Sequence, residues 1–381
     1  MHPTLHYSLL FFTYSHCPIS RTTLLFCFRR LHFVDPNRST TAAATARRLP
    51  PAMSLFIDIA ANLTDAMFQG HYNGTARHPP DLASVLGRAS DAGVVRTIVT
   101  AGDVASSSEA AALAASAATA THALYSTVGV HPTRAGEVRP LSADNPAGGP
   151  ADAIAGLATV AASAPGRVIA VGECGLDYDR LQFCDAPTQR AVFDRHFPLA
   201  ASTGLPMFLH CRGAAFPDFL DAVARHRGSF RAGVVHSFTG TPAERDAVLA
   251  VPELYLGVNG CSLKTADNIE TVKGIPLDRL LLETDSPYCG IRGTHAGVGA
   301  VVSTWPAKDK KKWEAGATVK GRVEPCHIRA VAEVVAASRG VNVETVARAA
   351  WANSVAVFWP AEVGGGGYDA AVAAARPPTV P

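Results

Sequence analysis

Short apolar runs rich in β-branched residues recur along the chain from residue 55 and alternate with longer stretches of helical composition. Runs of this kind are typical of strands that are buried on both faces of a parallel sheet. Thr241-Pro242-Ala243-Glu244 forms a capping box at the start of one intervening helix. We identify eight strands, at residues 55–59, 95–100, 125–130, 168–172, 206–210, 233–237, 254–258 and 280–284.

Alternation of eight strands with helices predicts an α/β protein with a parallel sheet. Eight such units within about 250 residues match the usual size of a closed (β/α)8 TIM barrel. An open doubly wound sheet would require a Gly-rich phosphate loop after the first strand, and residues 55–65, LFIDIAANLTD, contain no glycine. We therefore predict a TIM barrel, whose active site lies at the carboxyl ends of the strands.

Composition divides the chain into three regions. Residues 1–52 contain six arginines and one acidic residue, and we expect either a transit peptide for a mitochondrion or plastid or a disordered extension of a cytoplasmic or nuclear protein. Residues 53–362 hold the barrel pattern. Residues 363–381 are rich in Gly, Ala and Pro, which predicts a disordered tail.

Charge and cysteine content narrow the class of protein. The 381 residues are 48% hydrophobic and 17% charged, which is typical of a globular protein. Beyond residue 52 there are 28 basic and 31 acidic residues, so polyanion binding would depend on local basic loops or bound cations. No apolar run reaches the roughly 18 residues that span a bilayer. The eight cysteines form no Cys-x-x-C motif, and we expect reduced packing residues.

Side chains that can bind metals follow five of the predicted strands. A single histidine in such a place is more often a core or loop residue than a ligand. Five coincidences in one chain favour a shared site, because the carboxyl ends of barrel strands converge. The five residues are His131, Glu173, His210, His236 and Asp285.

These residues suit a catalytic metal site, in which a bridging carboxylate can hold two metals about 3.5–4 Å apart. Glu173 is central in sequence order and is the predicted bridge. His210 and His236 would bind one metal, while Asp285 would bind the other or accept a proton from the attacking water. The mixed oxygen and nitrogen set suits Mg²⁺, Mn²⁺ or Zn²⁺ and does not choose among them.

Such a site lowers the pKa of a bound water to about 7 and neutralises charge on a phosphoryl oxygen, as hydrolysis of a phosphodiester requires. An amide or ester could be cleaved by the same device. His131 is either a substrate contact or a loop residue bonded to backbone. Arg134, Arg212 and Lys264 are the candidates for contact with a substrate phosphate.

A long basic segment, residues 290–323, follows the last strand. It contains five lysines and two arginines, with Trp305 and Trp313 between them. Alternation of basic and aromatic residues suits contact with a nucleic-acid backbone, and a solvated surface loop is the other interpretation.

Six motifs together resemble the TatD-type metal-dependent deoxyribonucleases, in order and spacing, over residues 53–361; they read GVHPTR, GECGLDYDR, MFLHCR, VVHSFTGT, LYLGVNGCSLK and LLLETDSPY. The wording FIDIAANLTDAMFQG is most similar to the eukaryotic TatD DNase domain-containing protein 1 branch. The resemblance implies a barrel hydrolase that uses Mg²⁺ or Mn²⁺ to cleave DNA, commonly as a 3′ to 5′ exonuclease.

The resemblance also assigns roles to residues. Glu173, His210, His236 and Asp285 match the family's metal ligands, with Glu173 shared between two metals, so Asp285 and Glu173 are the catalytic carboxylates. His131 matches a functional histidine of the third-strand motif.

The chain departs from the family pattern in two places. Many relatives begin with Asp-x-His-x-His-Leu, whose histidines bind a metal, whereas Ala60 and Asn62 stand here. This implies a first metal with fewer protein ligands. In residues 322–325, RVEP, Val323 stands before Glu324 where relatives usually carry Asn.

Three functions remain open at this point. The favoured function is that of a metal-dependent deoxyribonuclease. The alternatives are a hydrolase of a small amide or ester and a catalytically weak relative that binds nucleic acid. Loss of the histidine pair fits the weak relative, but retention of all four other ligands argues against it. The sequence indicates DNA as the substrate and no obligate protein partner.

Overall fold

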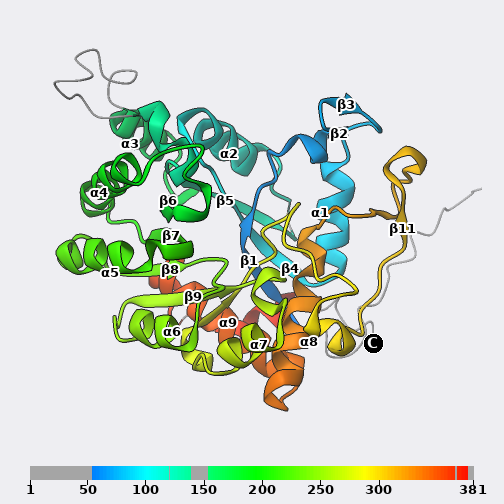
Figure 1. The fold of residues 1–381 in the computed structure, drawn as a ribbon. Helices are drawn as coiled ribbons and strands as arrows, with labels where there is room; N and C mark the ends of the chain where they lie inside the picture. The colour runs from blue at the N-terminus through cyan, green and yellow to red at the C-terminus, as the bar shows by residue number, and fades with distance from the viewer. Residues whose placement is uncertain (1–53, 120, 139–152, 365–366, 376–381) are drawn as a thin grey trace, which may run out of the picture. The chain divides into compact units, whose positions relative to one another are not determined.

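The computed structural model describes residues 54–119, 121–138, 153–364 and 367–375; the predicted basic extension at residues 1–52 lies outside them. Eight parallel strands form one sheet in sequence order (Figure 1). Their bounds are β1 Phe56–Ala61, β4 Val94–Val99, β5 Ala123–Val128, β6 Val168–Asp177, β7 Met207–Arg212, β8 Gly233–Val235, β9 Leu254–Val258 and β10 Leu280–Leu282.

The first and last strands meet just beyond their carboxyl ends. Ala61 forms a parallel bridge with Ser286. The amide of Asp285 donates to the carbonyl oxygen of Ala60 at 2.8 Å, and the amide of Asn62 donates to that of Ser286 at 2.6 Å. These contacts close the sheet, so the prediction of a (β/α)8 barrel is confirmed.

Helices alternate with the strands and cover the outside of the barrel (Figure 1). The capping box predicted at Thr241 is present at the start of α6. None of the helices in the described part of the chain has the length and apolar character needed to cross a membrane. Their bounds are α1 Leu82–Asp91, α2 Val104–Ser116, α3 Ala153–Ser163, α4 Ala186–Thr203, α5 Phe216–Arg225, α6 Pro242–Leu249, α7 Ala266–Lys273, α8 Ile328–Arg339, α9 Val343–Phe358 and α10 Gly367–Ala375.

The composition of residues 363–381 predicted a disordered tail, but part of this segment is helical. Residues 367–375 form α10, and Tyr368 is buried against Trp351 of α9. The Tyr368 hydroxyl accepts a hydrogen bond from the amide of Leu55 at 3.0 Å, beside the first strand. One aromatic anchor therefore orders an Ala-rich segment, because its burial adds apolar area that the composition alone does not indicate. Residues 376–381 lie outside the description.

The basic segment at residues 290–323 is held by a buried ion-pair network. Arg322 is 3% exposed and donates to Asp81 at 2.6 and 2.7 Å and to Glu324 at 2.9 Å. Arg88 donates to the same Glu324 at 2.7 Å. Trp313 donates its indole N–H to Asp81 at 3.0 Å. Arg322 is therefore a structural cation with no surface for a phosphate, whereas the segment's five lysines are exposed or half-exposed.

We predict that Arg322→Leu lowers the free energy of unfolding by about 3–5 kcal/mol, because it leaves buried carboxylates without a counter-charge. The measurement is urea unfolding of the full chain. Arg225→Leu is the matched control, since Arg225 is a half-exposed arginine that pairs with Asp221 and Asp194, and its loss should cost less than about 1 kcal/mol. Equal losses in the two variants would contradict the structural role of the network.

Candidate metal centre

Glu173 stands in a bulge of β6. The strand continues to Asp177, beyond the predicted end at residue 172, and its register against β7 shifts between Val171 and Cys174. Gly172 and Gly175 both have a φ of +145°, and a Cβ at either would overlap a carbonyl oxygen of β7. Only glycine fits these two positions without strain. The bulge therefore sets the direction of the Glu173 side chain between them.

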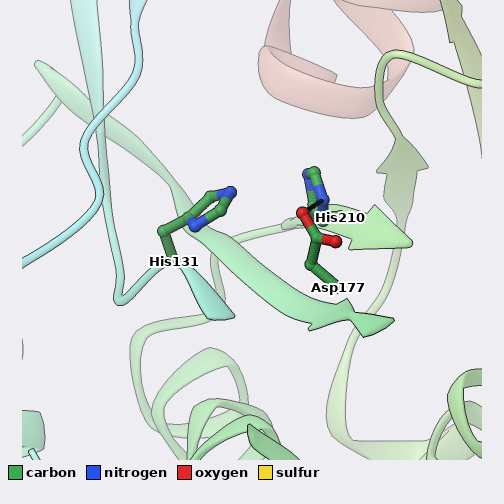
Figure 2. A group of neighbouring side chains, drawn as sticks. All are labelled: His131, Asp177 and His210. Carbon is green, nitrogen blue, oxygen red and sulfur yellow. Dashed lines mark hydrogen bonds and ion pairs between the residues drawn. The ribbon is translucent and has the colours of Figure 1, made fainter. Parts of the chain in front are cut away.

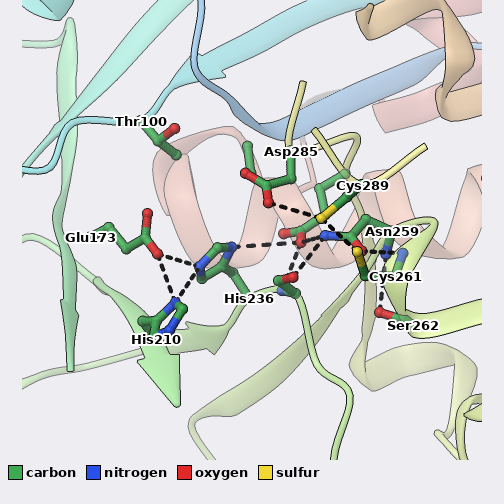
Figure 3. Close-up of polar contacts among 12 residues, drawn as sticks. Thr100, Glu173, His210, His236, Asn259, Cys261, Ser262, Asp285 and Cys289 are labelled. Atoms are coloured by element: carbon green, nitrogen blue, oxygen red, sulfur yellow. Dashed lines mark hydrogen bonds and ion pairs between the residues drawn. The ribbon is translucent and has the colours of Figure 1, made fainter. Parts of the chain in front are cut away.

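Three histidines surround one oxygen of Glu173. Its Oε1 lies 2.7 Å from Nε2 of His236, 2.8 Å from Nδ1 of His210 and 3.4 Å from Nε2 of His131. Figure 3 shows Glu173, His210 and His236 converging from three neighbouring strand ends. Ligand atoms of these three residues all lie within 4.8 Å of one another, as ligands of a single metal ion do.

Asp285 lies beside this group and is held by other side chains. Its Oδ1 accepts from Nδ2 of Asn62 at 2.9 Å. Its Oδ2 accepts from the thiol of Cys289 at 3.2 Å (Figure 3). Asn62 Oδ1 in turn accepts from the hydroxyl of Thr100 at 2.7 Å. Ala60 is fully buried. Asn62, which stands where many relatives carry a histidine, therefore orients the predicted metal ligand Asp285 through its side-chain amide.

Asp177 belongs to the site but was not among the predicted residues. Its Oδ2 lies 3.3 Å from Nε2 of His210, the ring atom opposite the one that faces Glu173 (Figure 2). Asp177, His131 and His210 form a second group whose ligand atoms lie within 4.8 Å of one another. Asp177 is the first aspartate of GECGLDYDR, beside the predicted ligand Glu173, and could have been recognised from that motif. It was not predicted because the strand was expected to end at residue 172.

Glu283 supports His236 from behind and was also not predicted. It is fully buried, and its Oε1 accepts from the amide of Ser237 at 2.6 Å and from Nδ2 of Asn259 at 2.9 Å. The same oxygen lies 3.6 Å from Nδ1 of His236. A carboxylate behind a ring fixes the orientation of a histidine ligand and raises its basicity. The sequence signal is the Glu of LLLETD, two residues before Asp285.

Burial and mutual contact shift the pKa values of the group. Burial alone would raise the pKa of Glu173, but the histidines hold it well below its usual range. Burial alone would lower the pKa of His236, but Glu173 and Glu283 hold it well above. Burial lowers the pKa of His131 to about 4 and raises that of Asp285 to about 6. His131 is thus neutral at pH 7, with a lone pair available on its ring.

The charges of the site fit a divalent cation. Among the residues that the structure describes, no lysine or arginine forms an ion pair with Glu173, Glu283 or Asp285. Protonated His236 compensates part of the charge of Glu173 and Glu283, and a bound divalent metal would compensate these buried carboxylates once the histidine is neutral. Imidazole and carboxylate ligands together suit Mg²⁺, Mn²⁺ and Zn²⁺.

The three candidate phosphate contacts differ in their partners. Arg134 is neutralised by ion pairs with Glu137, at 2.8 Å, and with Asp103. Arg212 donates to the hydroxyls of Thr239 and Ser237, so its charge is not cancelled by a carboxylate there. It lines a cavity of about 260 Å³ together with two aromatic residues, Phe216 and Phe238. Lys264 is exposed just beyond β9.

Comparisons with known proteins agree with the geometry. A family model described as TatD related DNase matches residues 57–359. The chain is 39% identical over 305 residues to "Deoxyribonuclease Tat-D" of Schizosaccharomyces pombe, covering 79% of this chain and 94% of that protein. It is 33% identical over 306 residues to "3'-5' ssDNA/RNA exonuclease TatD" of Erwinia amylovora, covering 79% and 98%.

A solved structure is also similar. A TatD family hydrolase of Entamoeba histolytica superposes with a TM-score of 0.74 at 31% identity, covering 81% of this chain and all of that one. This chain therefore shares its barrel fold with that solved structure.

We predict that Asn62→Ala weakens Mn²⁺ binding about 10- to 100-fold, because the amide orients Asp285 and loss of such a partner typically costs this much affinity. Calorimetric titration measures it. Asn342→Ala is the control, since Asn342 caps α9 far from the site in sequence and should lower only the stability. Equal affinity in wild type and Asn62→Ala would show that Asp285 needs no such support.

Proposed function

We propose that this chain, which belongs to the TatD related DNase family, is a divalent-metal-dependent deoxyribonuclease that hydrolyses phosphodiester bonds of DNA as a 3′ to 5′ exonuclease. The observation that carries the proposal is the single oxygen of Glu173 within 3.4 Å of three histidines at the carboxyl end of a matching barrel. Two relatives of this chain, a deoxyribonuclease and a 3'-5' ssDNA/RNA exonuclease, support the substrate and the polarity.

Two divalent ions fit the residues. Glu173, His210 and His236 would hold one, since their ligand atoms lie within 4.8 Å of one another. Asp285, together with Glu173 and water, would hold the other, with Asn62 Nδ2 donating to Asp285 Oδ1. Mg²⁺ or Mn²⁺ is favoured at the oxygen-rich second position, while Zn²⁺ also suits the histidines. When bound, such ions lower the pKa of a water and neutralise charge on a phosphoryl oxygen.

The protein side chains supply proton transfer and orientation. Burial raises the pKa of Asp285 to about 6, and its carboxylate would serve either as a ligand of the second metal or as the acceptor of a proton from the attacking water. His131, whose pKa burial lowers to about 4, stays neutral and is held by the contact between its Nδ1 and the hydroxyl of Thr133 at 2.7 Å. Its other nitrogen, Nε2, lies 3.4 Å from Glu173 Oε1.

Arg212 is the best placed of the candidate phosphate contacts. Its guanidinium is positioned by Ser237 and Thr239, which lie directly beyond the ligand His236. The same cavity is lined by Phe216 and the largely buried Phe238, and also by Asp179 and Glu244. Lys264 extends the positive surface along the strand ends. Arg134 contributes least, because two carboxylates already neutralise it.

We expect Glu173→Gln to reduce DNA cleavage at least about 100-fold with little change in the melting temperature, since glutamine keeps the size of the side chain but loses the charge that joins the two cations. The assay uses the full chain and single-stranded DNA labelled at either end, with Mg²⁺, Mn²⁺ or EDTA. Glu253→Gln, at the opposite end of the barrel strands, is the control.

Different outcomes separate the competing functions. Shortening from the 3′ end supports the exonuclease. Cleavage of p-nitrophenyl esters without cleavage of DNA would replace it with the small-ester hydrolase. DNA binding without cleavage in any of the metals would identify a weak relative that only binds. A folded Glu173→Gln protein with wild-type cleavage would contradict the two-metal arrangement.

A further inference from the structure

Two thiols meet at the carboxyl ends of β9 and β10. The sulfur atoms of Cys261 and Cys289 lie 2.8 Å apart (Figure 3). Two thiolates on a tetrahedral zinc ion would lie roughly 3.8 Å apart, since each Zn–S bond is about 2.3 Å. The separation is thus too short for a shared metal, and it is longer than the roughly 2.05 Å of a disulfide bond, so the two thiols are in contact but not bonded.

The backbones that carry the two cysteines are packed against each other. A Cβ at Gly260 would overlap the carbonyl oxygen of Cys289, so glycine at this position permits the approach. The proximity of the two sulfurs therefore follows from the path of the chain as well as from the side-chain rotamers.

The pair differs from the other cysteines in its exposure. Cys261 and Cys289 are both half-exposed, whereas Cys174 and Cys326 are fully buried. Cys211 is also half-exposed, but its thiol has no sulfur neighbour among the described residues. Accessible thiols with a second thiol nearby are suited to reversible oxidation to an intramolecular disulfide. The expectation that all cysteines serve packing therefore does not fit this pair.

We propose that Cys261 and Cys289 are a reversible thiol–disulfide site that hydrogen peroxide oxidises. One thiol gives up its proton, and its sulfur attacks a peroxide oxygen; the O–O bond breaks, yielding a sulfenic acid and one water. The second thiol then attacks the sulfenic sulfur, forms the S–S bond and releases a second water. Two thiols and one peroxide give one disulfide and two waters. A small dithiol reverses the reaction by exchange.

The disulfide acts on the proposed metal centre through Asp285. In the reduced form Cys289 donates its S–H to Asp285 Oδ2 at 3.2 Å. Oxidation removes this proton and shortens the sulfur separation to about 2.05 Å, drawing Cys289 toward Cys261. Asp285 then loses one of its two side-chain donors. We expect the nuclease rate to fall about tenfold or more, as loss of a ligand's supporting partner typically does. The effect on rate rests on the proposed function; formation of the disulfide does not.

The experiment treats the full chain with hydrogen peroxide, blocks free thiols and maps peptides by mass spectrometry. We expect a Cys261–Cys289 cross-link that has lost the mass of two hydrogens, a slower nuclease and recovery of both with dithiothreitol. Cys261→Ser should keep its basal rate and resist peroxide, and Cys289→Ser should also form no cross-link. Cys184→Ser, which changes a buried thiol elsewhere, should behave as wild type.

Three results would overturn the proposal. The first is independent oxidation of the two sulfurs without a cross-link. The second is equal loss of rate in wild type and Cys261→Ser. The third is a cross-linked protein with an unchanged rate, which refutes the control of Asp285. If the reduced protein cleaves no DNA, the proposed function fails. Peptide mapping by mass spectrometry still shows whether the Cys261–Cys289 disulfide forms, so the two failures can be distinguished.

Discussion

The carboxylate of Glu173 is the contact on which the rest of the site depends. Its position follows from Gly172 and Gly175, where the backbone of β7 leaves no room for a Cβ. The resulting bulge directs the side chain to a point that histidines from three other strands can reach. A residue with a Cβ at either glycine would have to displace β7, which also carries His210. The local geometry of one strand thus determines the geometry of the whole centre.

Around this contact the barrel buries several carboxylates, which is unfavourable unless donors or cations compensate them. Asn62 donates to Asp285, and Ser237 and Asn259 donate to Glu283. These neutral donors orient the carboxylates and leave their charges uncancelled. The site therefore keeps the attraction for cations that hydrolysis of a polyanion requires, while each side chain is held in one direction.

Much of this was predictable from the sequence. Periodic apolar runs predicted the eight strands, and five polar residues at their ends predicted where the chemistry lies, because parallel strands in a barrel converge at one face. Asp177 and Glu283 were missed because the glycines of β6 placed the expected strand end at residue 172, before Asp177, and because Glu283 lies at the end of an apolar run, two residues before the candidate ligand Asp285. Arg322 looked like a solvent-exposed cation, because no sequence pattern reveals that Asp81, 241 residues away, neutralises it. Long-range pairing of charges is a property of the fold.

The most direct measurement is a crystal structure of the full chain soaked in MnCl₂, with anomalous diffraction collected above the manganese absorption edge. Our account predicts two anomalous peaks that share Glu173, one also bound by His210 and His236 and the other by Asp285. Loss of both peaks is expected in Glu173→Gln crystals. Manganese bound without Glu173, or two peaks that persist in the variant, would contradict the central role of this carboxylate.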